Sequence, residues 1–329
     1  MKHYGNVPAK EKHLPLLLLT LIPILMFLIV FGVIIYQSIP AMVNPGFSVL
    51  FSLKFSNPYS FVYTPGEFGM TPALFGSLEL LFIALLIALP FSLLIAVLAT
   101  EYSLKGIGRI LEPILALFSG IPPILYGLLS VFVLVAFFRP KFVGVDLPET
   151  EIMKMPGLPE WSGSILPRNY SDLLAGILIG LLIIPFMAPL IIDAIRNVPQ
   201  NLKEASIALG ATRWYTLWRV ILPSSASGIA AAISLGALKT IGEVVIAAWT
   251  VGYVADGLPN PFFDVLEAKA PLTSAAAGLY SGMSPGGTPR SPTDASVAYF
   301  SGLLLMIIAF VILILVEIAQ RAIRRRFHP

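Results

Sequence analysis

The chain has 329 residues, and its composition is typical of a membrane protein. Hydrophobic residues make up 57% of the chain, against about 45 to 50% in soluble proteins. The 21 basic and 18 acidic residues give a net charge of +3 and leave several long stretches without any charge. This uneven distribution excludes a soluble two-domain enzyme.

The Cys and His content excludes several kinds of site chemistry. The sequence has no Cys, so it has no disulfide, thiolate metal site or cysteine nucleophile. Its three histidines, His3, His13 and His328, all lie in the terminal tails. No histidine-based site is therefore available inside the membrane, and we expect no catalytic residue, metal ligand or cofactor.

Six segments are apolar and long enough, or nearly so, to cross a bilayer as helices, which takes about 20 residues each. They run over 14–36, 80–99, 113–138, 173–192, 224–253 and 295–316. We therefore expect an all-α membrane protein with six transmembrane helices. Only the fifth segment carries charged side chains, at Lys239 and Glu243.

The first segment follows a basic start, so a cleaved signal peptide is an alternative interpretation. Its apolar run is longer than the usual stretch of about 7 to 15 residues in a signal peptide, and no clear cleavage site follows it. We therefore expect a retained transmembrane helix.

Lys and Arg residues are shared unevenly between the two sides of the spans. They are more frequent in the N-terminal tail, 100–112, 193–222 and 317–329 than in the three loops opposite. The positive-inside rule therefore predicts a cell-membrane protein with both termini in the cytoplasm. The opposite loops 139–172 and 256–294 are rich in Pro and Gly and cannot bury a core of their own. No basic patch interleaved with aromatic residues indicates nucleic-acid binding.

The cytoplasmic loop 193–222 is too long and too patterned for a simple connection between two helices. Asn197-Val198-Pro199 is typical of a helix start, and Gly210 is typical of a stop that needs a left-handed residue. We expect a helix over about 200–209. Beyond it, an apolar stripe at helical spacing predicts a second, amphipathic helix at the membrane interface. This stripe consists of Trp214, Leu217, Trp218 and Ile221.

The same loop resembles the EAA signature of permease subunits of binding-protein-dependent ABC importers. Glu204-Ala205-Ser206 is followed after three residues by Gly210, and after nine more by Val220-Ile221-Leu222-Pro223. Ser206 replaces an Ala of that signature and Val220 an Ile. In the family this loop docks on a separate ATPase subunit. The resemblance therefore implies that the ATPase is coupled through Glu204, Ala205, Ser206, Gly210, Leu222 and Pro223. From the pattern alone, a surface helix without a partner is equally acceptable.

The charged pair of the fifth segment needs an explanation, because an ionisable residue at bilayer depth costs about 2.5 to 3.5 kcal/mol. Lys239 and Glu243 are four residues apart and are expected to meet on one helix face. They either neutralise each other inside the bundle or line a pathway for an anion. The stretch from Lys239 to Glu243 is similar to the R-A-x-G-E stretch of permeases for phosphate, sulfate and molybdate, which implies that Lys239, Gly242 and Glu243 line the substrate path.

The third segment contains Pro122-Pro123, so its helix must kink or break there. The second half-helix would point the positive end of its dipole toward the middle of the bundle, which would suit an anion, although an ordinary packing kink is also possible. The run from Ser119 to Gly127 resembles the A-G-I-P-S-x-x-Y-G stretch of phosphate-specific permeases. Ser119, Gly120 and Pro122 are therefore implied in the substrate path. Leu98-Ala99-Thr100-Glu101-Tyr102 is similar to their L-S-E-Y segment.

Together these resemblances imply the type I ABC importer (MetI-like) permease fold and a role in phosphate import, with no catalysis by the chain itself. The implied partners are two ATP-binding ABC subunits, a second permease chain, homologous or identical, an extracytoplasmic phosphate-binding protein, phosphate and the lipid bilayer. We expect the permease domain over 72–316, with 1–71 before it and a basic tail over 317–329. The alternatives are a permease for molybdate, tungstate or sulfate, or an ion-coupled secondary transporter that uses Lys239 and Glu243 as a proton relay.

Overall fold

The computed structural model places most of the predicted spans and the cytoplasmic loop between the fourth and fifth. It describes residues 9–53, 68–102, 107–129, 172–251, 272–273, 276 and 292–327. The predicted loops 139–172 and 256–294 fall largely outside these residues, as do the two chain ends and residues 130–138 of the predicted third span.

The described residues form long helices joined by short ones. The long helices are α1 (Ala9–Ala41), α3 (Thr71–Thr100), α7 (Asp172–Arg196), α10 (Leu222–Ile241) and α13 (Pro292–Phe327). The shorter helices are α2 (Phe47–Leu50), α4 (Ile107–Ser119), α5 (Pro123–Leu129), α8 (Gln200–Ala208), α9 (Arg213–Thr216) and α11 (Val245–Thr250). Among the described residues, 5 helices are long and apolar enough to cross a membrane, and 6 if α4 and α5 are counted as one bent span. The prediction of six mainly apolar helical spans is confirmed on this count.

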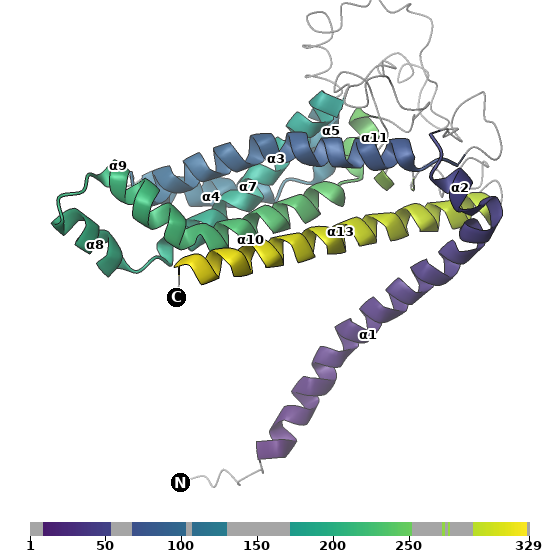
Figure 1. Ribbon diagram of the computed structural model, residues 1–329, viewed down its shortest axis with the longest axis horizontal. Coiled ribbons are helices and arrows are strands. Elements are labelled where there is room, and N and C mark those ends of the chain that lie inside the picture. Colours follow the sequence, from purple (N-terminus) through teal and green to yellow (C-terminus); the bar gives the residue numbers. More distant parts are fainter. Residues whose placement is uncertain are drawn as a thin grey trace, which may run out of the picture.

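The long helices α3, α7, α10 and α13 run side by side, and α8 and α9 lie at the end of the bundle where the chain finishes (Figure 1). Helix α7 is the centre of the packing, since it contacts α3, α10, α4 and α11. The fully buried side chains of α7 include Leu178, Ile179, Ile183, Met187, Ile191, Ile192 and Ile195. An apolar helix with side chains buried along its length is expected to lie inside a bundle.

Glycines let the helices around α7 approach closely. A Cβ atom on Gly176 of α7 would lie 2.5 Å from Cγ2 of Ile83 on α3. One on Gly180 would lie 3.0 Å from the carbonyl oxygen of Ala84. Small residues are common where membrane helices meet, because lipid offers no hydrophobic driving force and close van der Waals packing must hold them together.

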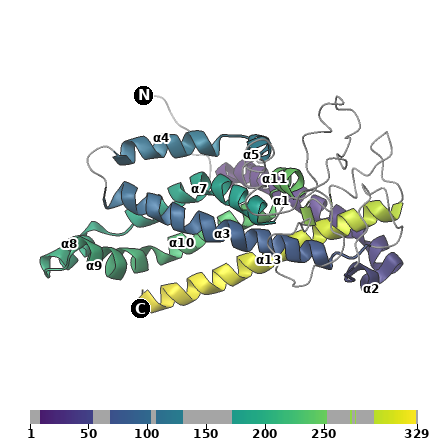
Figure 2. The same cartoon turned by 90° about the horizontal axis from the view of Figure 1, so that it is seen from above.

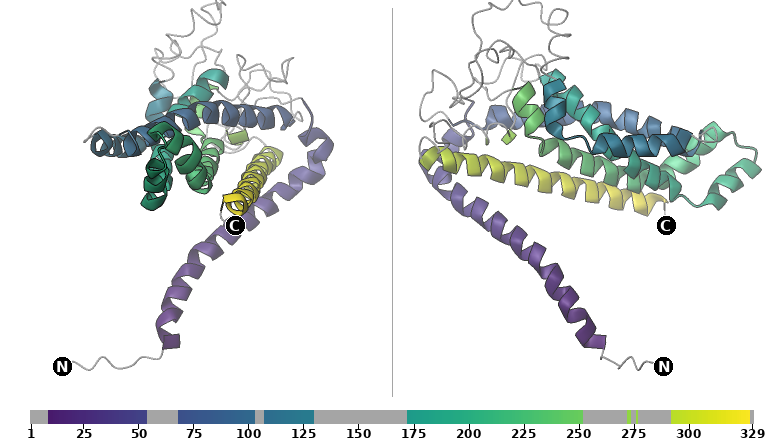
Figure 3. Two further views of the ribbon diagram at one scale, coloured as in Figure 1. Left: turned by 60° about the vertical axis from the view of Figure 1, so that its left-hand side comes forward. Right: turned by 180° about the vertical axis from the view of Figure 1, so that it is seen from behind.

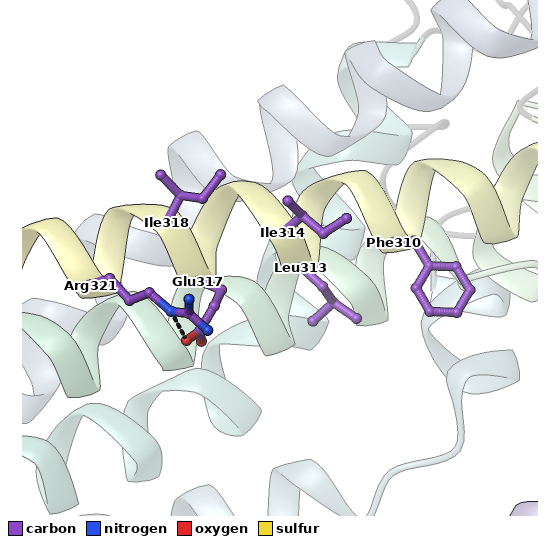
Figure 4. A pocket seen from close by; sticks show the side chains of 6 residues that line it. All are labelled: Phe310, Leu313, Ile314, Glu317, Ile318 and Arg321. Atoms are coloured by element: carbon purple, nitrogen blue, oxygen red, sulfur yellow. Dashed lines mark hydrogen bonds and ion pairs between the residues drawn. The ribbon is translucent and has the colours of Figure 1, made fainter.

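Helix α1 diverges from the bundle along most of its length (Figures 1 and 3). It meets α13 near Phe31, whose ring lies edge-on to that of Phe310 at 6.2 Å. From Phe310 toward the chain end, one face of α13 lines a shallow pocket that ends at the Glu317–Arg321 ion pair (Figure 4). None of the predicted site residues lines this pocket. Apolar side chains dominate it, as expected of a surface that faces lipid.

Two spans depart from a single straight helix. The third bends by 87° between α4 and α5, which confirms the break expected at the prolines. The fifth was expected to be one helix over 224–253, but α10 ends at Ile241 and α11 starts at Val245. That prediction was wrong because a glycine inside an apolar run is tolerated in many helices and does not by itself indicate a break.

A helix follows Gly210 as predicted, but it does not stand apart from the fifth span. Helix α9 continues through a π-helical turn, Leu217–Ile221, directly into α10. The backbone N–H of Leu222 donates to the carbonyl of Leu217, five residues earlier. Pro223 follows this turn. Proline has no N–H to donate, and its ring clashes with the carbonyl four residues earlier in a regular α-helix, so the wider turn accommodates it.

We predict that Gly176→Ala destabilises the bundle, because the new methyl group would overlap Ile83. Overpacking of this kind costs about 1 to 3 kcal/mol. The thermal midpoint of the purified protein in detergent measures the effect. Gly302→Ala on α13 is the matched control, since a Cβ there meets nothing within 4 Å. Equal midpoints for the two variants would contradict the packing described for α3 and α7.

Candidate functional site

Helix α8 ends in a tight corner at Gly210. The φ angle of Gly210 is +86°, in the left-handed region that favours glycine. Its N–H donates to the carbonyl of Ile207 at 2.9 Å, and the N–H of Ala211 donates to that of Ser206 at 3.2 Å. These bonds satisfy the last carbonyls of the helix. The predicted helix stop at Gly210 is therefore confirmed.

The surface of α8 is open to solvent along its whole length. None of its residues is buried, and Glu204 and Ala205 are both exposed. Large apolar side chains lie on it or at its end, and Leu209 is 89% exposed. We call α8 and its corner, residues 200–210, the cytoplasmic knob. A knob that presents apolar side chains and a carboxylate has the composition of a docking surface.

Side-chain contacts attach the knob to the bundle. Ser206 on α8 shares a hydrogen bond with Thr216 on α9, with 2.9 Å between the two hydroxyl oxygens. Lys203 on α8 donates from Nζ to Oε1 of Glu101, at the end of α3, at 2.6 Å. These contacts fix the knob's position although most of its residues stay exposed.

The structure gathers four of the six predicted coupling residues and places two elsewhere. Glu204, Ala205, Ser206 and Gly210 belong to the knob. Leu222 and Pro223 lie in the first turn of α10, where the chain enters the bundle, and both are half-buried. The second pair therefore lies at the base of the span and not on the exposed surface.

The predicted apolar stripe after Gly210 splits between two environments. Leu217 and Ile221 are buried in the bundle, whereas Trp214 and Trp218 are exposed. The two indole rings contact each other edge to face, with their centroids 5.5 Å apart. Exposed Trp side chains at the base of a membrane span are typical of the lipid headgroup region.

The charged residues of the fifth span do not meet as predicted. Glu243 lies beyond the end of α10, in the break before α11, and is only 8% exposed. Its Oε1 accepts hydrogen bonds from the backbone N–H groups of Val245 at 3.2 Å and Ile246 at 3.3 Å. The carboxylate therefore caps the N-terminus of α11, which its negative charge favours. The expected i, i+4 arrangement needs an unbroken helix, and the break at Gly242 removes it.

Lys239 is instead placed over an aromatic ring. Its Nζ lies 5.2 Å from the ring centroid of Phe186 on α7. No ion pair within 4 Å is found between Lys239 and an acidic side chain in the described part of the chain. The ring face attracts the ammonium group without neutralising its charge.

The two broken spans come together at their second halves. Helix α5 packs against α11, and Figure 2 shows the two short helices side by side. Ser119 ends α4, and Gly120 and Pro122 lie in the turn between α4 and α5; all three are exposed, and Gly242 lies in the turn before α11. The predicted path residues therefore lie at two helix breaks, one before α5 and one before α11. The helices that follow these breaks contact each other. Irregular backbone at this depth is tolerated only where protein or a water-filled cavity meets it.

The sequence analysis did not single out two acidic residues that the structure buries. Glu79 on α3 is 4% exposed, and Asp172 at the start of α7 is fully buried. The predicted second span began at residue 80, just beyond Glu79, whereas α3 starts at Thr71. Thr71-Pro72, with Pro in the first turn, was the available start signal.

Two named proteins align with most of the chain. The sequence is 30% identical to the phosphate transport system permease protein PstC of Haemophilus influenzae, over 76% of this chain and 75% of that one. It is 28% identical to the protein of the same name from Pasteurella multocida, over 65% of this chain and 67% of that one.

Solved structures show the same fold. A chain of a bacterial alginate ABC transporter, solved in complex with a periplasmic protein that holds an alginate pentasaccharide, matches with a TM-score of 0.57 and 17% identity. The match covers 95% of this chain and 96% of that one. The family model described as binding-protein-dependent transport system inner membrane component matches residues 88–329. The chain is thus a multi-pass membrane protein with the type I importer permease fold, and it belongs to the family of binding-protein-dependent transport system inner membrane components.

Proposed function

We propose that this chain is the permease subunit of an ATP-driven ABC importer that moves inorganic phosphate into the cell. The relatives named above are phosphate transport permeases. The observation that carries the coupling part of the proposal is the exposed knob, which ends at Gly210 and presents Glu204 and Leu209. A folded, exposed helix with apolar side chains suits a partner that is itself folded.

The proposed partners follow from the position of the knob. Two ATP-binding subunits would dock on the knobs of this chain and of a second permease chain, with both termini on the same cytoplasmic side. A binding protein on the opposite side would deliver phosphate. When ATP closes the two ATPase subunits, the knobs move together and access switches from outside to inside. This chain carries no catalytic residue in the proposal.

The proposed permease domain spans 72–316 and the proposed coupling loop 193–222, with residues 1–71 and the basic tail 317–329 outside the domain. The chain joins the knob to two spans at close range, because α7 ends at Arg196, just before the knob, and the continuous helical segment from α9 to α10 begins just after it. Displacement of the knob therefore acts directly on two spans. One is α7, the centre of the packing.

The proposed substrate path runs past the two helix breaks. Lys239 supplies the cation, and Phe186 holds it. Ser119, Gly120 and Pro122 line the path at one break, and Gly242 and Glu243 at the other. A lysine attracts an anion as a point charge and lacks the bidentate geometry of arginine, which suits passage more than tight retention.

We predict that Glu204→Lys and Gly210→Pro abolish co-purification of the ATPase subunit while the permease still inserts. The first replaces the exposed carboxylate of the knob with a cation. The second removes the N–H that donates to Ile207 and forces a positive φ on a residue that cannot adopt it. Affinity purification of the permease, with the ATPase detected by immunoblot, measures the effect. Glu317→Lys, a charge reversal on the exposed surface of α13, is the control; normal ATPase recovery with either knob variant argues against the docking assignment.

We predict that Lys239→Gln lowers phosphate uptake by roughly tenfold or more, since a hydrogen bond to a charged group contributes about 1.5 to 3 kcal/mol. Uptake of labelled phosphate by the assembled importer in liposomes is the measurement. Lys239→Arg keeps the charge and is expected to retain most of the uptake. The amount of assembled complex stays at the wild-type level in both variants. Unchanged uptake in Lys239→Gln would assign this lysine to packing alone.

The same liposomes test the substrate and the energy source. Phosphate uptake should stop when ATP is omitted, even if a proton gradient is maintained. Competition by molybdate, tungstate or sulfate at equal concentration should be weak. Uptake driven by the gradient alone would indicate a secondary transporter, and strong competition would indicate another oxyanion as the cargo.

A further inference from the structure

Glu101 has no role in the mechanism proposed above, although it lies in the Glu-Tyr segment singled out in the sequence. It is the C-cap residue of α3, and its backbone N–H donates to the carbonyl of Val97 at 2.9 Å. Its carboxylate points to the knob and accepts a hydrogen bond from Lys203, with 2.6 Å between Nζ and Oε1. The two residues are 102 positions apart in the sequence.

The position of Glu101 makes this ion pair stronger than an ordinary surface pair. A carboxylate at the C-terminal end of a helix is repelled by the negative end of the helix dipole. The positive charge of Lys203 offsets the negative charge of the Glu101 carboxylate. It also offsets the partial negative charge on the last carbonyls of α3. The two side chains are only 15% and 20% exposed, so solvent screens their attraction less than it screens a fully exposed pair.

The ion pair adds a connection that the chain itself does not provide. Helix α8 packs against α9 and the π-helical turn, and the hydroxyls of Ser206 and Thr216 reinforce that side. The chain joins α8 to α7 and, through α9, to α10. Helix α3, in contrast, is far from α8 in the sequence, and Lys203 ties it to the knob by a direct side-chain contact.

We propose that Glu101 and Lys203 form a latch that transmits displacement of the knob to α3. This inference rests on the proposed function, in which an ATPase moves the knob. With the latch closed, the knob moves α3 together with α7 and α10, so the three tightly packed spans respond as one body. Without the latch, the push reaches α3 only through its packing against the neighbouring spans α7 and α10, as far as the described residues show. Both residues act as positioning residues, since neither contacts the transported anion.

The chain contains a matched control for the latch. Arg196, at the end of α7, forms an ion pair with Glu112 of α4, so it also joins two helices on the same side of the bundle. This pair does not involve α8, and its side chains are 47% and 42% exposed. Glu112→Gln breaks the same pair outside the proposed coupling loop 193–222, and is therefore expected to leave coupling near the wild-type level.

The test uses the complete importer in liposomes, with its binding protein and ATP, and measures phosphate taken up per ATP hydrolysed. Glu101→Gln and Lys203→Gln should each lower this ratio by at least about fivefold, the lower end of typical coupling effects. ATPase co-purification should stay normal in both. The swapped pair, Glu101→Lys with Lys203→Glu, should restore the ratio. Both swapped charges suit their helix ends, since Lys would lie at the C-terminus of α3 and Glu near the N-terminus of α8.

Several outcomes would overturn the latch. A loss of coupling in Lys203→Gln but not in Glu101→Gln would mean that Lys203 contacts the ATPase directly. Wild-type ratios in both single variants, or no recovery in the swapped pair, would also overturn it. If the single variants prove unstable, the thermal midpoint decides: a swapped pair that recovers stability but not coupling assigns the ion pair to folding alone.

The latch and the proposed function can fail separately. Normal ATPase recovery with Glu204→Lys would remove the docking function and the latch with it. Lost recovery with Glu204→Lys, together with wild-type coupling in the Glu101 and Lys203 variants, would remove the latch and leave the docking function standing.

Discussion

The close approach of α3 to α7 is the constraint on which the rest of the structure depends. Lipid tails are as apolar as the side chains of these helices, so burial alone does not hold the spans together. Gly176 and Gly180 allow α3 to pack directly on the α7 backbone, and Gly236 of α10 lies against Met187 of α7 in the same way. The result is a stiff unit of three helices. Movement applied at one end of such a unit is carried along it, because packed interiors do not deform continuously.

Among the described residues, the helix breaks next to this unit lie at its two ends. On one side, the knob and the π-helical turn carry exposed side chains. On the other, the spans break before α5 and α11, and the two short helices support each other. Glu243 accepts from two of the free N–H groups at the start of α11, so the protein itself supplies partners for backbone that the break exposes. The three packed helices α3, α7 and α10 therefore separate the knob, which is proposed to dock the ATPase, from the helix breaks that are proposed to line the substrate path.

Length and hydropathy were sufficient to predict the spans, and local backbone chemistry was sufficient for the end of α8. Gly210 could be assigned because a left-handed corner strongly favours glycine. The break at Gly242 could not, because its stability comes from the carboxylate of Glu243 and from packing against α5, which are tertiary effects. The contacts of Lys203 with Glu101 and of Lys239 with Phe186 were also beyond sequence reasoning, since they join helices far apart in the chain. For the candidate site, the sequence therefore supplied candidate residues but not the contacts among them.

The exposure of Leu209 has a consequence for how cells handle this protein. A large apolar side chain that is 89% exposed at the tip of the knob is unfavourable in water unless another surface covers it. Permease made in excess of its proposed motor subunit would leave that tip bare, and would be prone to self-association and to removal by quality-control proteases. Synthesis of the permease and its motor subunit in matching amounts would keep this apolar tip covered.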